Sequence, residues 1–304
     1  MAPAPGLKVN LSSPNPRSRI GKKAVILPLK IVDHIMLNDP SKEAENEPIE
    51  VRCYFVRERN ALLVRGDFSP LYTDYYLHLM QHGIKHERAQ DDLLKDGLAA
   101  LTLHLSSRPR NEAAAWTLSW QDPLQNLFVT GSNRSGNVVG RVFTEDVRER
   151  DTNLFIAQVM VAGQESRQSM IKAETLDMFK VAEAFYHQSE QRPGRYFRHS
   201  EEDFVMVSAQ PDCDLAWLEA LDDEGIRAID EAEMLSLLET RVFRFDCGCS
   251  PGRIFPIIAG MTEEALEVVF GEGEVLAAGC PRCAARYVIT RESLEAFKRE
   301  RASS

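Results

Sequence analysis

Short segments with apolar residues at alternating or adjacent positions recur through the first two thirds of the chain and predict a β-sheet. Turn-forming residues such as Gly, Pro, Asn and Asp separate these segments, as they do between the strands of an antiparallel meander. The predicted strands lie near residues 51–56, 62–64, 115–120, 127–129, 138–143, 154–161, 166–171 and 204–207.

A helical repeat of apolar residues occupies other parts of the chain. Leu94, Leu98 and Leu101, for example, share one helix face. Because such helices group outside a meander of strands, the predicted fold class is α+β. We expect helices over residues 71–82, 91–105, 175–186 with Thr175 as its N-cap, within 229–239, and over 262–270.

Changes in composition divide the chain into four predicted parts. Residues 1–48 are rich in Pro, Ser, Asn and charge and indicate an N-terminal extension with mobile ends. Residues 49–215 form an α+β core domain, 216–243 a helical linker, and 244–304 a small cysteine-containing domain. The linker carries apolar residues that predict a helix stripe packed on the core domain. They are Met234, Leu235, Leu237 and Leu238.

Composition and charge narrow the partners and the location. The net charge is −10, and without a long basic run this argues against nucleic acid. No apolar segment is long enough for a membrane span or a secretory signal, so we expect a cytoplasmic protein with no membrane partner. Residues 1–32 contain basic side chains and no acid, which leaves an organelle-targeting segment as an alternative.

Four of the six cysteines form two closely spaced pairs near the C-terminus. Cys247 and Cys249 flank one glycine, and Cys280 and Cys283 are separated by Pro-Arg. Zinc prefers four soft ligands in a tetrahedron, which two short cysteine loops supply when the fold brings them together. We therefore predict one Zn²⁺ per chain, held by these four cysteines in the reduced protein, and we assign no role to Cys53 or Cys213.

Other interpretations of the same cysteines lead to different proteins. The zinc could be purely structural, or the pairs could be disulfides, although no secretory signal is present. A Cys-x-x-Cys sequence is also typical of thiol-disulfide enzymes, in which a thiolate lies at a helix N-terminus. Cys280 and Cys283 instead precede a strand-like segment at residues 287–289, which favours zinc.

Two further motifs do not support a site. Gly131 and Gly136 have the outer spacing of a phosphate loop, but Asn137 follows where Lys is required, so we predict a hairpin turn. His78 and His82 recur at helical spacing without a carboxylate, and we interpret them, with His86, as residues of a surface helix. No Ser/His/Asp or paired-carboxylate arrangement stands out. We therefore predict no catalytic residues and no enzyme.

The cysteine segment resembles the heat-shock protein 33 family of redox-regulated holdase chaperones. The resemblance covers about residues 48–297 and is strongest around the cysteines. It is carried by Phe245, Cys247, Gly248, Cys249, Ser250, Arg253, Cys280, Cys283 and Tyr287, and more weakly by residues 186–193 and 136–140.

The resemblance implies a redox switch. In the family, the reduced zinc-loaded form is inactive, and oxidation expels zinc and leaves two disulfides, which here would join Cys247 to Cys249 and Cys280 to Cys283. The oxidised protein would bind unfolding client proteins, with Met234, Leu235, Leu237 and Leu238 among the client-binding residues, and the resemblance leaves a homodimer on oxidation open.

Zinc loss is expected to unfold the cysteine domain. Structural zinc contributes about 10–16 kcal/mol in small peptides, whereas whole domains are stable by only about 5–15 kcal/mol. A domain of about sixty residues cannot be expected to keep its fold after that loss. Leu266, Val269 and Phe270 would then add exposed adhesive surface.

One departure from the family affects this mechanism. The segment at residues 211–246 is shorter than the family's helical linker, the part that unfolds to expose client-binding surface. We therefore expect a smaller difference between reduced and oxidised activities than in a relative with the full linker. Two alternatives are a constitutive binding or scaffold protein with structural zinc, and a thiol-disulfide oxidoreductase.

Overall fold

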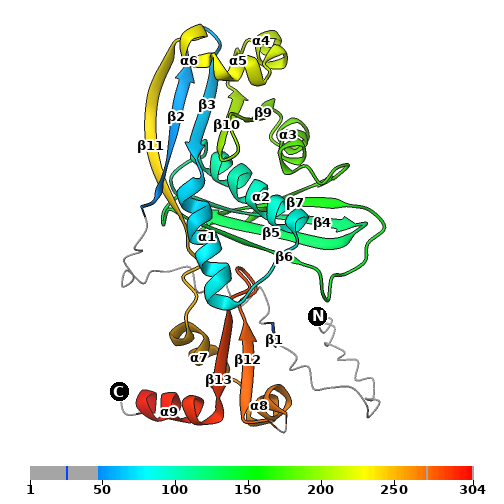
Figure 1. The fold of residues 1–304 in the computed structure, drawn as a ribbon, viewed down its shortest axis with the longest axis vertical. Coiled ribbons are helices and arrows are strands. Elements are labelled where there is room, and N and C mark those ends of the chain that lie inside the picture. The colour runs from blue at the N-terminus through cyan, green and yellow to red at the C-terminus, as the bar shows by residue number, and fades with distance from the viewer. Residues whose placement is uncertain (1–24, 27–46, 272, 303–304) are drawn as a thin grey trace.

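A single ten-stranded sheet organises most of the chain in the computed structural model, which describes residues 25–26, 47–271 and 273–302 (Figure 1). Neighbouring strands are antiparallel except for the pair β6–β11, which is parallel. This arrangement confirms the predicted α+β class. Across the sheet the order is β8 (Arg167–Lys172), β7 (Leu154–Val161), β4 (Glu112–Gln121), β5 (Leu124–Ser132), β6 (Asn137–Phe143), β11 (Leu235–Phe245), β2 (Ile49–Val56), β3 (Ala61–Asp67), β10 (Asp203–Ala209) and β9 (Gly194–Arg198).

The strands that were predicted from alternating apolar and polar residues are present in this sheet. In β2, Ile49, Val51 and Cys53 are buried while Glu50 and Arg52 are exposed, because successive side chains of a strand point to opposite faces. The segment from Gly131 to Gly136 is a hairpin connection between β5 and β6, as predicted.

Strand β11 corrects the prediction of a helix within residues 229–239. Only the four-residue helix α6 (Ile229–Ala232) forms there, and the chain then enters β11, which pairs with β2 and, at its end, with β6. The backbone hydrogen bonds to β2 outweigh the helical spacing of the four apolar residues. The prediction was wrong because pairing between distant segments is not visible in a local sequence pattern. The predicted helical linker is thus helical only in its first half, in α4 (Leu215–Ala220), α5 (Asp223–Arg227) and α6.

Two helices cover the sheet and a third leads away from it. Helix α2 (Arg88–Ser106) is buried along most of its length, and α3 (Met178–Gln188) packs beside it. Helix α1 (Ser69–His82) runs from the sheet toward the C-terminal part of the chain (Figure 1). The N-cap of α3 is Asp177 and not Thr175, since the Asp177 carboxylate accepts from the amides of Phe179 and Lys180.

The C-terminal module, residues 246–302 without 272, lies at one end of the molecule (Figure 1). It contains α7 (Pro251–Ala259), α8 (Glu263–Phe270), the hairpin of β12 (Val275–Gly279) and β13 (Arg286–Thr290), and α9 (Arg291–Ala302). The predicted helix at 262–270 and strand near 287–289 are both present. Of the predicted N-terminal extension, the structure describes only β1 (Val25–Ile26), which pairs in parallel with β12, and residues 47–48.

No helix of the described residues is both long enough and apolar enough to cross a membrane.

Candidate metal centre

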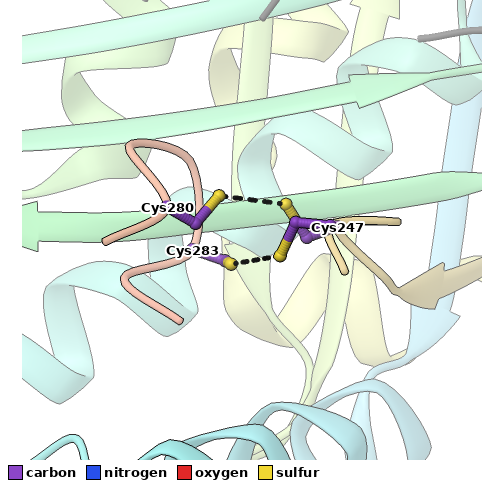
Figure 2. Close-up of side chains that lie close together, drawn as sticks. Cys247, Cys280 and Cys283 are labelled. Atoms are coloured by element: carbon purple, nitrogen blue, oxygen red, sulfur yellow. Dashed lines mark hydrogen bonds between the residues drawn. The ribbon is translucent and has the colours of Figure 1, made fainter. Parts of the chain in front are cut away.

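Two loops from different parts of the fold bring the four predicted cysteines together. Cys247 and Cys249 follow directly after β11, and Cys280 and Cys283 lie in the turn that joins β12 to β13. Figure 2 shows the labelled Cys247, Cys280 and Cys283 with their sulfurs turned toward one another. The sequence therefore identified the four residues, and the fold supplies their convergence.

The sulfur atoms have the spacing of metal ligands. All four lie within 4.8 Å of one another. The Sγ atoms of Cys247 and Cys280 are 3.6 Å apart and those of Cys249 and Cys283 are 3.4 Å apart, and no disulfide joins them. A tetrahedron with zinc–sulfur bonds of about 2.3 Å places its sulfurs roughly 3.8 Å apart. Among the described residues the candidate donor set consists of four thiols, which fits a soft or borderline ion such as zinc.

Backbone conformation turns the sulfurs inward. Gly248 has a φ of 63°, in the left-handed region that a residue with a side chain rarely adopts, and its amide donates to Asp246 Oδ1 over 2.8 Å. In the second loop the amide of Ala284 donates to the carbonyl of Cys280, and the amide of Cys280 donates to the carbonyl of Ala285. The first loop is therefore closed by a bond from a main-chain amide to a carboxylate, and the second by two main-chain bonds.

The crowded sulfurs do not share their protons equally. Hydrogen bonds from the thiols of Cys247 and Cys249 lower the pKa of Cys280, and the main-chain amide of Arg282 acts in the same direction. The pKa of Cys247 is raised, chiefly through its hydrogen bond with Cys249 and secondly through that with Cys280. Only the thiolate is a metal ligand, so metal binding at this site requires these thiols to lose their protons.

Module residues also tie the two loops to each other. The Tyr287 hydroxyl donates to the carbonyl of Cys249 over 2.9 Å and lies 3.2 Å from its sulfur. Buried Arg282 donates to the carbonyl of Cys247 over 3.2 Å, and its Nη2 atom has no hydrogen-bond partner among the described residues. Four thiolates around Zn²⁺ carry two net negative charges, so a buried guanidinium beside them suits such a centre.

Sequence reasoning missed the involvement of helix α1. His78 Nε2 lies 2.9 Å from the carbonyl oxygen of Cys283, and the His82 ring packs edge-on against Tyr287. Both histidines are half-buried and contact the module, so they are not ordinary residues of a surface helix. Gly83 ends the helix with a φ of 61°, and His86 lies beyond it. The spacing of the histidines was visible, but their partners are about two hundred residues away in sequence.

The remaining cysteines lie outside the cluster. Cys53 is buried in β2, and burial raises its pKa to about 11. Burial also raises the pKa of half-buried Cys213. Cys280 lies in a turn between strands and not at a helix start, so the feature that activates the cysteine of thiol-disulfide enzymes is missing from this pair.

The predicted client-binding residues do not form a packed stripe. Met234, Leu237 and Leu238 are 56%, 57% and 57% exposed, whereas Leu235 packs against the small cluster beneath α4 to α6. Leu238 lies where the pairing of β11 with β2 shifts register. The strand is irregular at this point, and Leu237 and Leu238 both face outward. Because these residues pair with β2 as a strand, they do not form a helix docked on the core domain.

A sheet domain joined to a small module with four converging thiols defines the class: a tetracysteine protein with an α+β core. Residues 198–290 match the family model described as Hsp33 protein, a span that includes all four cysteines. The C-terminal third of the chain is therefore similar to the Hsp33 family in the segment that carries the cysteines.

A search of solved structures finds a similar fold over most of the chain. A crystal structure of the 33 kDa chaperonin (heat shock protein 33 homolog) from Thermotoga maritima superposes with a TM-score of 0.63 at 11% sequence identity. The alignment covers 84% of this chain and 99% of that one. Comparison with curated protein sequences finds no match. At this low sequence identity the structural match shows only a similar fold. The family model shows sequence similarity in the segment that contains the cysteines.

Proposed function

We propose that this protein is a redox-regulated holdase chaperone whose switch is the centre formed by Cys247, Cys249, Cys280 and Cys283. The observation that carries the proposal is the convergence of four unbridged thiols within 4.8 Å in a segment that matches the Hsp33 family. The chaperone role follows the family, and the switch follows from the chemistry of the thiols.

In the reduced protein the four thiolates would hold one Zn²⁺ ion and keep the two loops joined. Zinc would supply structural stabilisation here and no catalytic step. Within the chain, Tyr287 and Arg282 hold the carbonyls of Cys249 and Cys247 in place. The helices of the module pack around a separate small cluster that includes Leu266 and Phe270.

Oxidation would remove the ligands. Each disulfide takes two electrons from two thiolates, and one hydrogen peroxide with two protons accepts them to give two water molecules. Two disulfides therefore consume two peroxide molecules and leave no thiolate for the metal. We propose, on the family resemblance, that Cys247 pairs with Cys249 and Cys280 with Cys283. The shortest sulfur distances run across the two loops, from Cys247 to Cys280 and from Cys249 to Cys283, so peptide mapping of the oxidised protein decides the pairing.

Metal loss would unfold the module and expose its apolar residues. The apparent free energy of structural zinc, about 10–16 kcal/mol, exceeds what a cluster of this size can replace. Leu266 and Phe270, which are buried in the described structure, would then become available to clients, and Val269 would become more exposed.

A second client-binding surface is proposed at the start of β11. Met234, Leu237 and Leu238 are more than half exposed while the module is docked, so they need no unmasking. We therefore expect measurable activity in the reduced state and a modest increase on oxidation. We expect the protein to act in the cytoplasm on unfolded or partly folded proteins.

The test measures zinc content and client protection on the same sample. Reduced protein, purified without chelators, should contain one zinc per chain and suppress light scattering by a heat-unfolding client only weakly. After peroxide at raised temperature, zinc should be released and suppression should rise. A Cys213→Ser variant serves as the matched control, because Cys213 is outside the cluster and should switch normally.

The alternatives predict different results in this experiment. Zinc release without a gain in client protection would contradict the switch and indicate a scaffold with structural zinc. Reduction of a disulfide substrate that depends on Cys280 and Cys283 would indicate a thiol-disulfide oxidoreductase.

A further inference from the structure

The cysteine cluster packs against the large domain, which comprises residues 49–245 and contains the ten-stranded sheet, and is separate from the apolar cluster of the module's own helices. Cys247, Cys280 and Cys283 belong to the same buried cluster as Trp116 and Leu98 of the large domain. The apolar residues of α7, α8 and α9 form a different cluster. The candidate metal centre is therefore situated at the contact between the sheet domain and the C-terminal module.

Two side chains of the large domain reach the main chain of the ligand residues. Arg141 of β6 donates from Nη1 to the carbonyl oxygen of Cys280 over 3.1 Å. His78 of α1 places Nε2 at 2.9 Å from the carbonyl oxygen of Cys283. Since a carbonyl oxygen only accepts, His78 must carry its proton on Nε2. Both ends of the Cys280–Cys283 turn are thus bonded to the large domain.

Each donor is itself held in place by aromatic rings. The Arg141 guanidinium lies 4.0 Å from the centre of the Phe143 ring. The His78 ring lies 5.3 Å from the ring of Phe245, two residues before Cys247, and Phe245 also packs edge-on against Tyr75. Donors that are fixed by packing lose little side-chain entropy when they bond, which makes them effective in orienting a partner.

Charge favours the same arrangement. Burial lowers the pKa of Arg141, and the nearby sulfurs of Cys280 and Cys283 act in the opposite direction. Arg141 Nε also lacks a hydrogen-bond partner among the described residues. An arginine remains charged even when partly buried, so it offsets part of the negative charge that four thiolates bring to a zinc ion.

We propose that Arg141 and His78 are positioning residues of the metal centre. They hold the Cys280–Cys283 turn in its zinc-binding shape and thereby couple zinc occupancy to docking of the module on the large domain. The inference rests on the proposed zinc centre and adds how metal loss is transmitted. By linkage, if docking strengthens zinc binding, zinc strengthens docking by the same factor. Loss of the ligand geometry would release both carbonyl bonds and separate the module from α1 and β6.

The test compares zinc affinity in full-length variants by competition with a chromophoric chelator. Arg141→Met and His78→Leu should each weaken zinc binding by about 10- to 100-fold, the usual effect of removing a partner of a metal ligand. His78→Gln retains an N–H donor near the position of Nε2 and should restore part of the affinity. The controls are Arg52→Met, whose native side chain makes an exposed ion pair with Glu50, and His187→Leu, at an exposed position of α3. Both controls should bind zinc like the wild type.

A second readout separates positioning from a general structural role. Hydrogen exchange in residues 276–290 of the zinc-loaded protein should accelerate in Arg141→Met and His78→Leu. The melting temperature of the large domain, measured in the metal-free full-length variants, should stay unchanged. A drop in that melting temperature matching the loss of zinc affinity would instead indicate a structural role and would overturn the proposal. Because the two substitutions lie on different elements, His78→Leu carries the test if Arg141→Met does not fold.

The outcome is distinguishable from failure of the chaperone function. Zinc affinity within about twofold of the wild type in folded Arg141→Met and His78→Leu would overturn the coupling, even if oxidation still activates client protection. Weakened zinc affinity in both variants supports the coupling, even if client protection proves absent.

Discussion

The large domain encloses helix α2 with strands from both halves of its sheet, whereas the C-terminal module packs three helices on a single hairpin. Leu98, Leu101 and Leu103 of α2 are fully buried in a core that extends from Trp116 to Phe204. The module's own cluster contains eight buried residues, among them Ile258 and Leu266. A core of the first kind stabilises a domain without help, and one of the second kind depends on a metal or on a larger neighbour.

The module has both kinds of support at one place. Its four cysteines can hold a metal ion, and the same loops receive hydrogen bonds from Arg141 and His78 of the large domain. If the proposed switch operates, an oxidant would act at this contact, alter the module and leave the large domain folded.

The largest effect is expected from removal of two of the proposed metal ligands. A Cys280→Ser plus Cys283→Ser variant should bind no zinc and lose the structure of residues 246–302, while residues 49–209 stay protected from hydrogen exchange. The physical reason is that structural zinc contributes about 10–16 kcal/mol, more than a small module has to lose. Hydrogen exchange followed by mass spectrometry measures both regions in one sample. Full protection of the module in the metal-free variant would show that its own cluster suffices.

A core substitution should reverse the pattern. Leu101→Ala removes a fully buried side chain from α2 and should lower the free energy of unfolding of the large domain by about 2–5 kcal/mol. Zinc content at a temperature where the domain is still folded should not change. Chemical denaturation monitored by circular dichroism gives the stability. A loss of zinc equal to that of the cysteine variant would mean that the two regions cannot be separated.

Acid should weaken the large domain through a buried histidine. His104 is buried beside Trp116 and Phe185, its Nδ1 lies 2.8 Å from the Tyr186 hydroxyl, and burial places its pKa well below the usual value, with Arg108 and Arg192 acting in the same direction. The unfolded state binds the proton more readily, so this contribution to stability is present above pH 6.5 and is lost as the pH falls below it. One proton changes the stability by at most about 1.4 kcal/mol per pH unit.

A comparison of the wild type with His104→Gln isolates the contribution of His104 to the pH dependence of stability. Melting temperatures measured between pH 7.5 and 5.5 should fall more steeply in the wild type than in the variant. Zinc content must be measured in parallel, because acid also protonates thiolates and would release a bound metal, which would lower the melting temperature as well. Parallel slopes for the two proteins would assign the acid sensitivity to other groups.

The smallest effect on stability is expected at the exposed start of β11. Leu237→Ser plus Leu238→Ser changes two side chains that are each 57% exposed, and surface substitutions of this kind alter stability by about 0.5 kcal/mol or less. If these leucines bind clients, protection by the reduced protein should decrease while zinc content and melting temperature stay the same. Light scattering of a heat-unfolding client measures the change. Val288→Ser, at an exposed position of β13 in the module, is the matched control.

The sequence by itself determined most local elements and the four candidate ligands. Alternating apolar residues predicted most strands of the sheet, and the spacing of Leu94, Leu98 and Leu101 predicted α2. The two cysteine pairs predicted the four residues that could hold a metal ion, because the members of each pair are close in sequence and therefore close in any fold. These features depend on short-range geometry, which a local pattern records.

Only the tertiary structure decided where the remaining parts lie. Residues 235–239 have helical spacing but form a strand, because the backbone of β2 offers them hydrogen bonds. Met234, Leu237 and Leu238 consequently face solvent and not the core domain. His78 and Arg141 meet the carbonyls of Cys283 and Cys280 across 205 and 139 residues of chain, respectively. Contacts at that separation arise when distant segments pack, and no periodicity in a single sequence encodes which segments will meet.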